Sequence, residues 1–264
     1  MRLVAFINEK GGSCKTTLVS SIGDYLARSK GQRVLLVDLD PQGQLGKILG
    51  VEVGAQRRTA LDLLLDTVLG EDTRPPLPIL SVRPPRLDLV ASNKSLALFP
   101  EGLPEPSGGE HLHLREALTG VRGYDLVLFD APPSFGPITL NVLLAATEVV
   151  IPVPLTYLAL DGAAEITRTV EMVRTRFRHP GLRITMVVPT FSRRTRLARE
   201  ILLKLREHFP KEVAQTTLGY SVAIDEAQSH AQTIFEYAPS STIAKSMAAL
   251  AEELIARDPA EANS

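Results

Sequence analysis

The chain has 264 residues, of which 44% are hydrophobic and 22% charged, and its formal net charge is −1. This balance is typical of a soluble globular protein, and it requires any binding to nucleic acid to come from a local patch of cations. The single cysteine, Cys14, excludes a disulfide framework and an all-cysteine metal or iron–sulfur site within one chain.

The length suits one large α/β domain spanning residues 1–264. No apolar run approaches the roughly 18 residues that a membrane span requires. The first residues enter a strand without the basic and apolar regions of a signal peptide. We therefore expect a cytoplasmic protein without a membrane partner.

The segment Val4–Thr17 has the order strand, glycine-rich loop, helix start, and a helix-compatible stretch follows from Leu18 to Arg28. Backbone N–H groups of such a loop converge on phosphate oxygens, and the helix N-terminus adds partial positive charge. A lysine supplies a full charge and a threonine hydroxyl is available to Mg²⁺. The residues predicted to bind a nucleotide are Lys10, Gly11, Gly12, Ser13, Cys14, Lys15, Thr16 and Thr17.

Cys14 stands where phosphate loops ordinarily carry glycine. If this position needs a positive φ, its Cβ costs about 1–2 kcal/mol, and the thiol crowds the phosphates. A loop that binds nucleotide but turns over poorly is therefore an alternative. A further hypothesis is that the thiol, close to Lys15 and to a helix N-terminus, has a lowered pKa and is sensitive to oxidation.

The next apolar run, Val34–Val37, predicts a strand buried on both faces, and two carboxylates, Asp38 and Asp40, stand at its C-terminal end. Ligands of open parallel sheets bind at that end of the strands. We expect both aspartates to face the phosphate loop, with Asp38 in the magnesium shell. A capped strand-end turn is the plain alternative.

Residues 45–69 predict a mostly helical segment. Residues 71–85 contain five prolines and predict a loop or extended edge, and residues 86–91 predict another strand. The segment 101–109 is rich in proline and glycine. We interpret the two proline-rich pieces, near 71–86 and 100–109, as insertions on one domain; a domain boundary there is the alternative.

After a helix predicted over 112–118, four apolar residues, Leu126–Phe129, end at Asp130. This is the Walker B pattern, in which a buried strand delivers one carboxylate to the magnesium shell beside the phosphate-loop threonine. We assign Thr16 and Asp130 to the metal. Helices over 139–146, 160–177, 196–209 and 243–256 and strands over 148–154 and 184–188 complete the pattern.

This alternation of strands and helices predicts a doubly wound, mostly parallel sheet with helices on both faces. Within it, Ser192–Arg206 holds six cations against one acid. Its leucines and isoleucine should face the sheet and push the cations outward, where phosphate contacts would be independent of base sequence and sensitive to salt. A solvated helix face is the other interpretation.

Three ordered motifs resemble the deviant Walker A family of ParA/MinD ATPases: the two-lysine loop at 10–17, Asp38–Gly43, and Asp130–Ser134. A Glu-Ala-x-Ser segment at 226–229 also matches, and the resemblance runs from Leu3 to about Leu254. It implies a P-loop NTPase fold. It also implies that Lys10 reaches across a dimer to the partner's nucleotide, that Lys15 holds phosphates and that Asp40 positions the attacking water.

The resemblance also implies a DNA-binding surface after the strand at 184–188. The matching residues in this chain are Arg193, Arg194, Arg196 and Arg199. The chain departs from the family over Leu218–Ser229, where two arginines are missing. The family's proline and asparagine near the adenine are Gly219 and Ser221 here, so we expect backbone groups there to contact the base. The same departures indicate that DNA binding is weaker or differently placed.

As implied by the resemblance, ATP and Mg²⁺ are the cofactors, and ATP promotes a sandwich homodimer that binds DNA without sequence preference. A ParB-like partner stimulates slow hydrolysis, which drives plasmid or chromosome partition on the nucleoid. The alanine-rich, acidic C-terminal helix counts against a membrane cycle. The alternatives are an orphan cargo-positioning or regulatory member of the family, and a nucleotide-binding switch with little hydrolysis because of Cys14.

Overall fold

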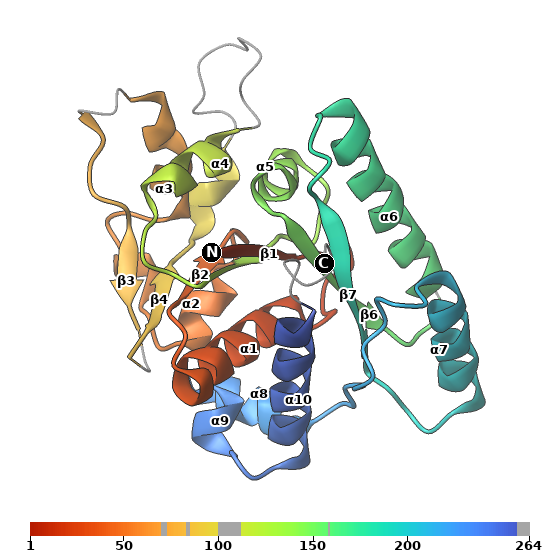
Figure 1. Cartoon of the computed structure of the whole chain (residues 1–264). Helices are drawn as coiled ribbons and strands as arrows, with labels where there is room; N and C mark the ends of the chain where they lie inside the picture. Colours follow the sequence, from red (N-terminus) through yellow and green to blue (C-terminus); the bar gives the residue numbers. More distant parts are fainter. Residues whose placement is uncertain (70–72, 83–84, 100–111, 158, 258–264) are drawn as a thin grey trace.

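The computed structural model describes residues 1–257 apart from 70–72, 83–84, 100–111 and 158. Across this part of the chain, one sheet of seven strands has the order β3-β4-β2-β5-β1-β6-β7 (Figure 1). The β3 strand is antiparallel to β4 and every other pairing is parallel, which confirms the mostly parallel α/β sheet. The strands are β1 Arg2–Phe6, β2 Val34–Asp38, β3 Ile79–Ser81, β4 Leu87–Val90, β5 Leu126–Asp130, β6 Glu148–Pro154 and β7 Arg183–Thr190.

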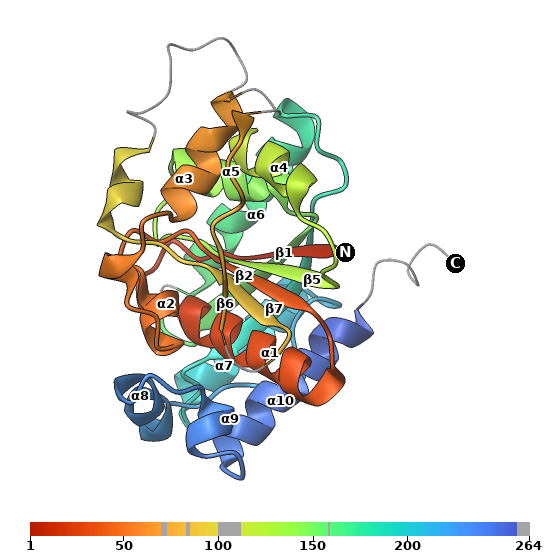
Figure 2. The same cartoon turned by 90° about the vertical axis from the view of Figure 1, so that its left-hand side faces the viewer.

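Helices cover both faces of the sheet, and strand periodicity decides which side chains meet which layer. Successive strand residues point to opposite faces, so Val34 and Leu36 join one core while Leu35 and Val37 join the other. The first core packs under α1, α2, α9 and α10, and the second under α3 to α7 (Figures 1 and 2). The helices are α1 Lys15–Lys30, α2 Gln44–Ile48, α3 Ala60–Leu65, α4 His113–Ala117, α5 Pro137–Ala145, α6 Ala159–Arg176, α7 Arg196–His208, α8 Val222–Ser229, α9 Ile234–Tyr237 and α10 Thr242–Ala256.

The strand order creates the crevice in which a ligand can bind. The chain runs from β1 to β2 and β4 on one side, returns to insert β5 between β2 and β1, and then continues to β6 and β7 on the other side. Ligands of open α/β sheets bind where the winding direction reverses, at the C-terminal ends of the strands. Here that position is the end of β1 and β5, which is where the glycine-rich loop begins.

The segment 45–69 differs from its helical prediction. It contains two short helices, α2 and α3, separated by a non-helical stretch with a 3₁₀ turn at Val53–Ala55. Gly50 has φ 75°, which ends the first helix. Thr59 starts the second one with a capping box, in which the Asp62 carboxylate accepts from the Thr59 N–H at 2.7 Å. The helix break at Gly50 and the new start at Thr59 therefore replace the single helical segment that the apolar periodicity predicted.

The proline-rich segment near 71–86 holds the short edge strand β3, as expected for an extended edge. Its residues 71–72 and 83–84, and the whole 100–109 piece, lie outside the described residues. Two helices, α8 and α9, form where the sequence predicted none. Among the described helices, none combines the length and apolar character needed to cross a bilayer.

Candidate functional site

The loop between β1 and α1 wraps the N-terminus of α1 with two residues in left-handed conformation. Gly12 has φ 68° and Cys14 has φ 76° and ψ 19°. Cys14 is the N-cap of α1 and forms no capping hydrogen bond through its side chain. Position 14 therefore does adopt a positive φ. Because Cys14 carries a Cβ, this left-handed conformation costs about 1–2 kcal/mol.

The thiol hypothesis is wrong in its direction. Burial, with the nearby Asp225 carboxylate as a second cause, raises the pKa of the Cys14 thiol to about 11. The thiolate is the reactive form of cysteine. Because the thiol stays protonated at neutral pH, Cys14 is a packed side chain at the loop, not an activated nucleophile or a sensitive oxidation site.

Lys15 is buried beneath the loop, and its ammonium is held by backbone. Its Nζ donates to the carbonyl oxygen of Asn8 at 2.8 Å and to that of Lys10 at 3.4 Å. Burial lowers the pKa of Lys15, while Asp130 and Asp40 oppose that shift. The cation thus lies at the loop among carbonyl oxygens that an incoming phosphate could replace.

Asn8 was missed by the sequence analysis, although it is the residue that fixes the loop. Its amide Nδ2 donates to the Pro152 carbonyl at 2.5 Å, and its Oδ1 accepts from the Lys10 N–H at 2.8 Å. It is also buried. One side chain therefore ties the start of the loop to the neighbouring strand β6; an asparagine after an apolar strand was the available signal.

Asp130 lies at the end of β5, in register with Phe6 of β1 and Asp38 of β2. It is 1% exposed, and neither carboxylate oxygen forms a hydrogen bond within the described part of the chain. Burial raises the pKa of Asp130 to about 7, against the opposite influence of Thr16 and Lys15. A buried carboxyl without partners is costly for the protein unless a cation joins it.

Asp38 ends the adjacent strand but has a different environment. Its Oδ1 accepts from the Asp40 N–H at 3.1 Å, and its Oδ2 accepts from the N–H groups of Leu45 and Gly46 at 3.1 and 3.4 Å. Burial and the neighbouring Asp130 raise its pKa well above the ordinary range. These bonds make Asp38 the residue that fixes the turn into α2, and its expected place in the magnesium shell stays a prediction.

Gly43 shows why that turn has its sequence. It has φ 61°, and a Cβ there would lie 2.5 Å from the backbone oxygen of Ser92. The turn brings Asp40 to the phosphate loop, half-exposed, with Oδ1 accepting from the Gln42 N–H at 2.9 Å. Asp40 is therefore presented at the surface of the crevice.

A cavity of about 350 Å³ opens on the loop and joins parts of the chain that are far apart in sequence. Its lining comes from the phosphate loop, the turn after β2, the loop after β5, the residue that follows β7, and α8. The lining residues are Gly11, Gly12, Ser13, Cys14, Lys15, Thr16, Thr17, Asp40, Gln42, Gln44, Pro133, Phe191, Asp225 and Gln228.

The α8 side of the cavity is built differently from the expectation. Phe191, Asp225 and Gln228 line it, whereas Gly219 and Ser221 stand at neighbouring positions on the segment that leads into α8. Gln228 Nε2 donates to the Thr17 hydroxyl at 3.1 Å. This bond attaches α8 directly to the first turn of α1.

Lys10 does not line its own chain's cavity. Its backbone N–H is held by Asn8, but its half-buried side chain forms no ion pair or hydrogen bond with any described residue. The ammonium is therefore available to a group outside this chain.

The four arginines assigned to DNA begin two residues after Phe191. All four are exposed, namely Arg193, Arg194, Arg196 and Arg199. Thr195 caps the N-terminus of α7 by accepting from the Ala198 N–H at 3.2 Å. Arg196 pairs with Glu200 at 2.7 Å. The patch is adjacent to the cavity but is not part of it.

The expectation that the leucines of α7 face the sheet holds only in part. Ile201 and Leu205 are buried, but Leu197 and Leu203 are 47% and 59% exposed. A single helix of this length presents a limited apolar stripe to one layer. The arginine surface is therefore interrupted by exposed leucines.

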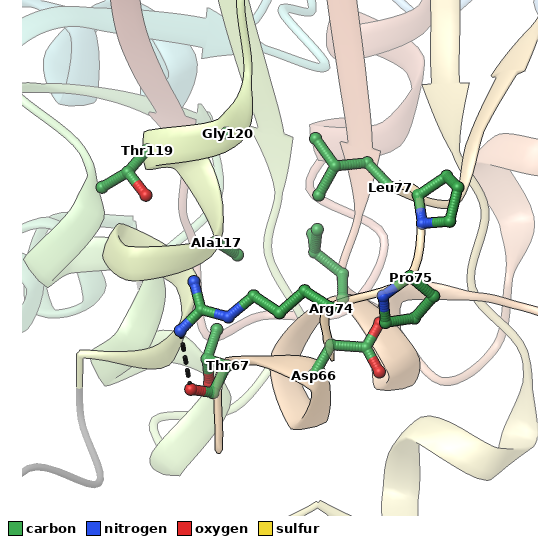
Figure 3. A pocket seen from close by; sticks show the side chains of 10 residues that line it. Asp66, Thr67, Arg74, Pro75, Leu77, Ala117, Thr119 and Gly120 are labelled. Atoms are coloured by element: carbon green, nitrogen blue, oxygen red, sulfur yellow. Dashed lines mark hydrogen bonds between the residues drawn. The ribbon is translucent and has the colours of Figure 1, made fainter. Parts of the chain in front are cut away.

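A second cavity, of about 360 Å³, lies between α3, the segment 74–77 and α4 (Figure 3). Its polar groups are satisfied within the protein, since Arg74 donates to the Thr67 carbonyl at 2.8 Å and Asp66 is paired with Arg58. Figure 3 shows the Arg74 side chain lying across the cavity toward Thr67. The first cavity is the better candidate for chemistry, because the phosphate loop, Lys15 and Asp40 line it and the buried Asp130 carboxyl lies beside Lys15 and Thr16.

Comparisons with known proteins agree with this geometry. A family model described as an AAA domain matches residues 1–184. The chain is 42% identical to the chromosome-partitioning ATPase Soj of Thermus thermophilus over 97% of this chain and 96% of that protein. It is 33% identical to the chromosome partitioning protein ParA of Caulobacter vibrioides, over 98% and 95% of the two chains.

Among solved structures, a Mycobacterium smegmatis protein described as cobyrinic acid a,c-diamide synthase with bound ADP and magnesium superposes with a TM-score of 0.79 at 30% identity. The match covers 96% of this chain and 94% of that one. The full-length agreement in sequence and fold, together with the two-lysine phosphate loop, places the chain in the ParA/Soj family of chromosome-partitioning ATPases.

Proposed function

We propose that the protein is an ATP- and Mg²⁺-dependent ATPase of plasmid or chromosome partition that works as a nucleotide-controlled dimer on DNA. The observation that carries the proposal is the buried, unpartnered carboxyl of Asp130 beside the phosphate loop. The bound nucleotides and magnesium of a structural relative and the names of the sequence relatives support it.

The loop would bind the β- and γ-phosphates through its backbone N–H groups and Lys15. On nucleotide binding, the Lys15 ammonium would replace its hydrogen bond to the neutral Asn8 carbonyl with one to a charged phosphate oxygen. Hydrogen bonds between two charged groups are stronger than those to a neutral acceptor. Gly12 and Cys14 keep this backbone in the conformation that directs N–H groups toward one point.

The residues present fit magnesium. Thr16 offers a hydroxyl, and the orphaned oxygens of Asp130 offer the carboxylate that a hard cation prefers. No described group of three or more His, Cys, Asp or Glu side chains forms a protein-only metal cage, which suits an ion held largely by phosphates and water. Bound there, magnesium would supply positive charge to the phosphate oxygens.

Asp40 is the group that would orient the attacking water. It lines the cavity, one oxygen accepts from the Gln42 N–H, and the other forms no hydrogen bond within the described residues. A second, open oxygen at the mouth of the cavity can accept a hydrogen bond from a water positioned for attack on the terminal phosphate.

Lys10 would act in trans. Within its own chain the ammonium has no ion pair among the described residues and does not line the cavity. In a sandwich dimer, the partner subunit's Lys10 would stabilise charge that develops on the transferred phosphoryl group. A cation supplied this way is worth about 10³–10⁵ in rate in related hydrolases, so dimerisation would gate turnover.

The proposal has three further parts: the dimer binds DNA without sequence preference, a ParB-like partner stimulates hydrolysis, and the protein resides on the nucleoid. The exposed arginines at the start of α7 supply cations for phosphate contacts. Phe191, two residues before Arg193, lines the nucleotide cavity, so a change at the cavity could alter the position of these arginines.

The second candidate is a nucleotide-binding switch with little hydrolysis, and the left-handed Cys14 favours it specifically. ATP binding measured by calorimetry with and without magnesium, and ATPase assays of the native protein beside Cys14→Gly, separate the two. Turnover by the native protein supports the ATPase. The switch is supported if the native protein binds ATP without hydrolysing it and Cys14→Gly restores hydrolysis. A protein with no affinity for adenine nucleotides would overturn both proposals.

A further inference from the structure

The cavity has two chemically different ends. Asp40, Gln42 and Gln44 stand at the end of β2, on the side where Asp130 marks the expected magnesium position. Phe191 lines the opposite side, because it directly follows β7, which lies across β1 from β2 in the sheet, and Asp225 is connected to it through Tyr220. If the terminal phosphate lies near Asp130, as in the proposed function on which this inference rests, the nucleoside must extend toward Phe191 and Asp225.

Asp225 is an acidic residue where a nucleotide-binding cavity would be expected to avoid one. It lies in the first turn of α8, is exposed, and forms no ion pair with any described cation. Its charge reaches the phosphate loop, since it contributes to the raised pKa of Cys14. A carboxylate at this place repels phosphate, so a bound nucleotide has to present a neutral hydrogen-bond donor to it.

The side chain is held in position for such a contact. The Tyr220 hydroxyl donates to Asp225 Oδ2 at 2.7 Å, and the ring of Tyr220 lies 6.5 Å from that of Phe191. One turn further along α8, Gln228 is bonded to Thr17. The Gln228 contact attaches α8 to the first turn of α1, and the Tyr220 contact occupies Oδ2 of Asp225 and leaves Oδ1 as the available acceptor.

Two groups of a nucleoside donate hydrogen bonds, the ribose hydroxyls and the base amino group. The ribose is the part next to the phosphates, and Asp225 is within electrostatic reach of the phosphate loop. The aromatic ring of Phe191 offers an apolar face for the base. An acidic residue accepting from a ribose hydroxyl is also the solution used by dinucleotide-binding folds.

We propose that Asp225 accepts a hydrogen bond from a ribose hydroxyl of the bound nucleotide and makes the site selective for ribonucleotides over deoxyribonucleotides. Hydrogen bonds to charged groups are strong enough that losing this one weakens binding about tenfold or more. Tyr220 is the positioning residue that holds the carboxylate in this orientation.

The test measures binding of ATP, 2′-deoxy-ATP and 3′-deoxy-ATP with magnesium by calorimetry. The native protein should bind at least one deoxy analogue about tenfold more weakly than ATP, and Asp225→Ala should bind ATP and that analogue equally. Glu226→Gln, which removes the adjacent exposed carboxylate, is the matched control and should discriminate like the native protein. Thermal unfolding of each variant checks that the fold is intact.

Equal binding of ATP and both deoxy analogues by the native protein would overturn this inference and leave the proposed ATPase standing. An Asp225→Ala variant that still prefers ATP over the deoxy analogue would also overturn it. A variant that binds all three nucleotides more tightly by the same factor would do so too, because Asp225 would then only repel phosphate. No binding of any nucleotide would overturn the inference together with the proposed function.

Discussion

Asp130→Asn is the substitution for which the structure makes its most quantitative prediction. The native carboxyl is buried without a hydrogen-bond partner among the described residues, and burial raises its pKa from 3.8 to about 7. The folded protein therefore keeps this proton to a higher pH than the unfolded chain. Between about pH 4 and pH 7 the folded state binds more protons, so the free energy of unfolding falls as pH rises through this window.

The magnitude follows from the same two pKa values. At 1.36 kcal/mol for each tenfold change in an acid constant, the interval from 3.8 to about 7 corresponds to a loss of about 4 kcal/mol by pH 7 to 8. Asparagine cannot ionise, so Asp130→Asn should lack this loss. The Asp130 charge also raises the pKa of the adjacent Asp38, and the substitution relieves that effect as well.

The assay is urea unfolding of the nucleotide-free protein in EDTA at several pH values from 4.5 to 8. The difference in free energy of unfolding between Asp130→Asn and the native protein should grow by about 3 kcal/mol in favour of the variant across this range, because about 1 kcal/mol of the loss already lies below pH 4.5. Asp125→Asn, which removes an exposed carboxylate just before the same strand, is the matched control. A difference for Asp130→Asn that does not change with pH would refute the reasoning.

Three further predictions concern the loop, the dimer and the DNA surface. Cys14→Gly removes about 1–2 kcal/mol of left-handed strain and adds about 0.5–1 kcal/mol of glycine entropy cost, so urea unfolding should show a gain of no more than about 1.5 kcal/mol. ATP turnover should rise, and unchanged turnover would contradict the idea that the Cys14 thiol crowds the phosphates. Lys10→Ala should lower turnover at dimer-forming concentrations by about 10³-fold or more with ATP affinity nearly unchanged, and native turnover in this variant would discard the trans role. Arg193→Ala and Arg194→Ala should each lower the magnitude of the slope of log affinity for duplex DNA against log salt concentration by about 0.9. Arg206→Ala, further along α7, is the control, and slopes equal to the native value would show that Arg193 and Arg194 do not contact DNA.

Much of the molecule was predictable from local patterns. Four or five apolar residues in a row predict a strand buried on both faces, and a glycine-rich loop before a helix predicts an anion site. These signals depend only on neighbours in the chain, so they identified the phosphate loop, the strands that end at Asp38 and Asp130, and the parallel sheet. The motif order was equally local, and the relatives confirmed the family that it indicated.

Tertiary structure decided what local patterns could not distinguish. Asp38 and Asp130 both end apolar strands, yet the turn into α2 directs three N–H groups to the Asp38 carboxylate, and no N–H group of that turn reaches the carboxylate of Asp130. Asp225 lies more than two hundred residues from Cys14 in the chain, and only the packing of α8 against α1 brings it to the loop. The charge and hydrogen bonding of a buried group depend on which backbone dipoles and side chains surround it in space, and the packed fold decides those surroundings.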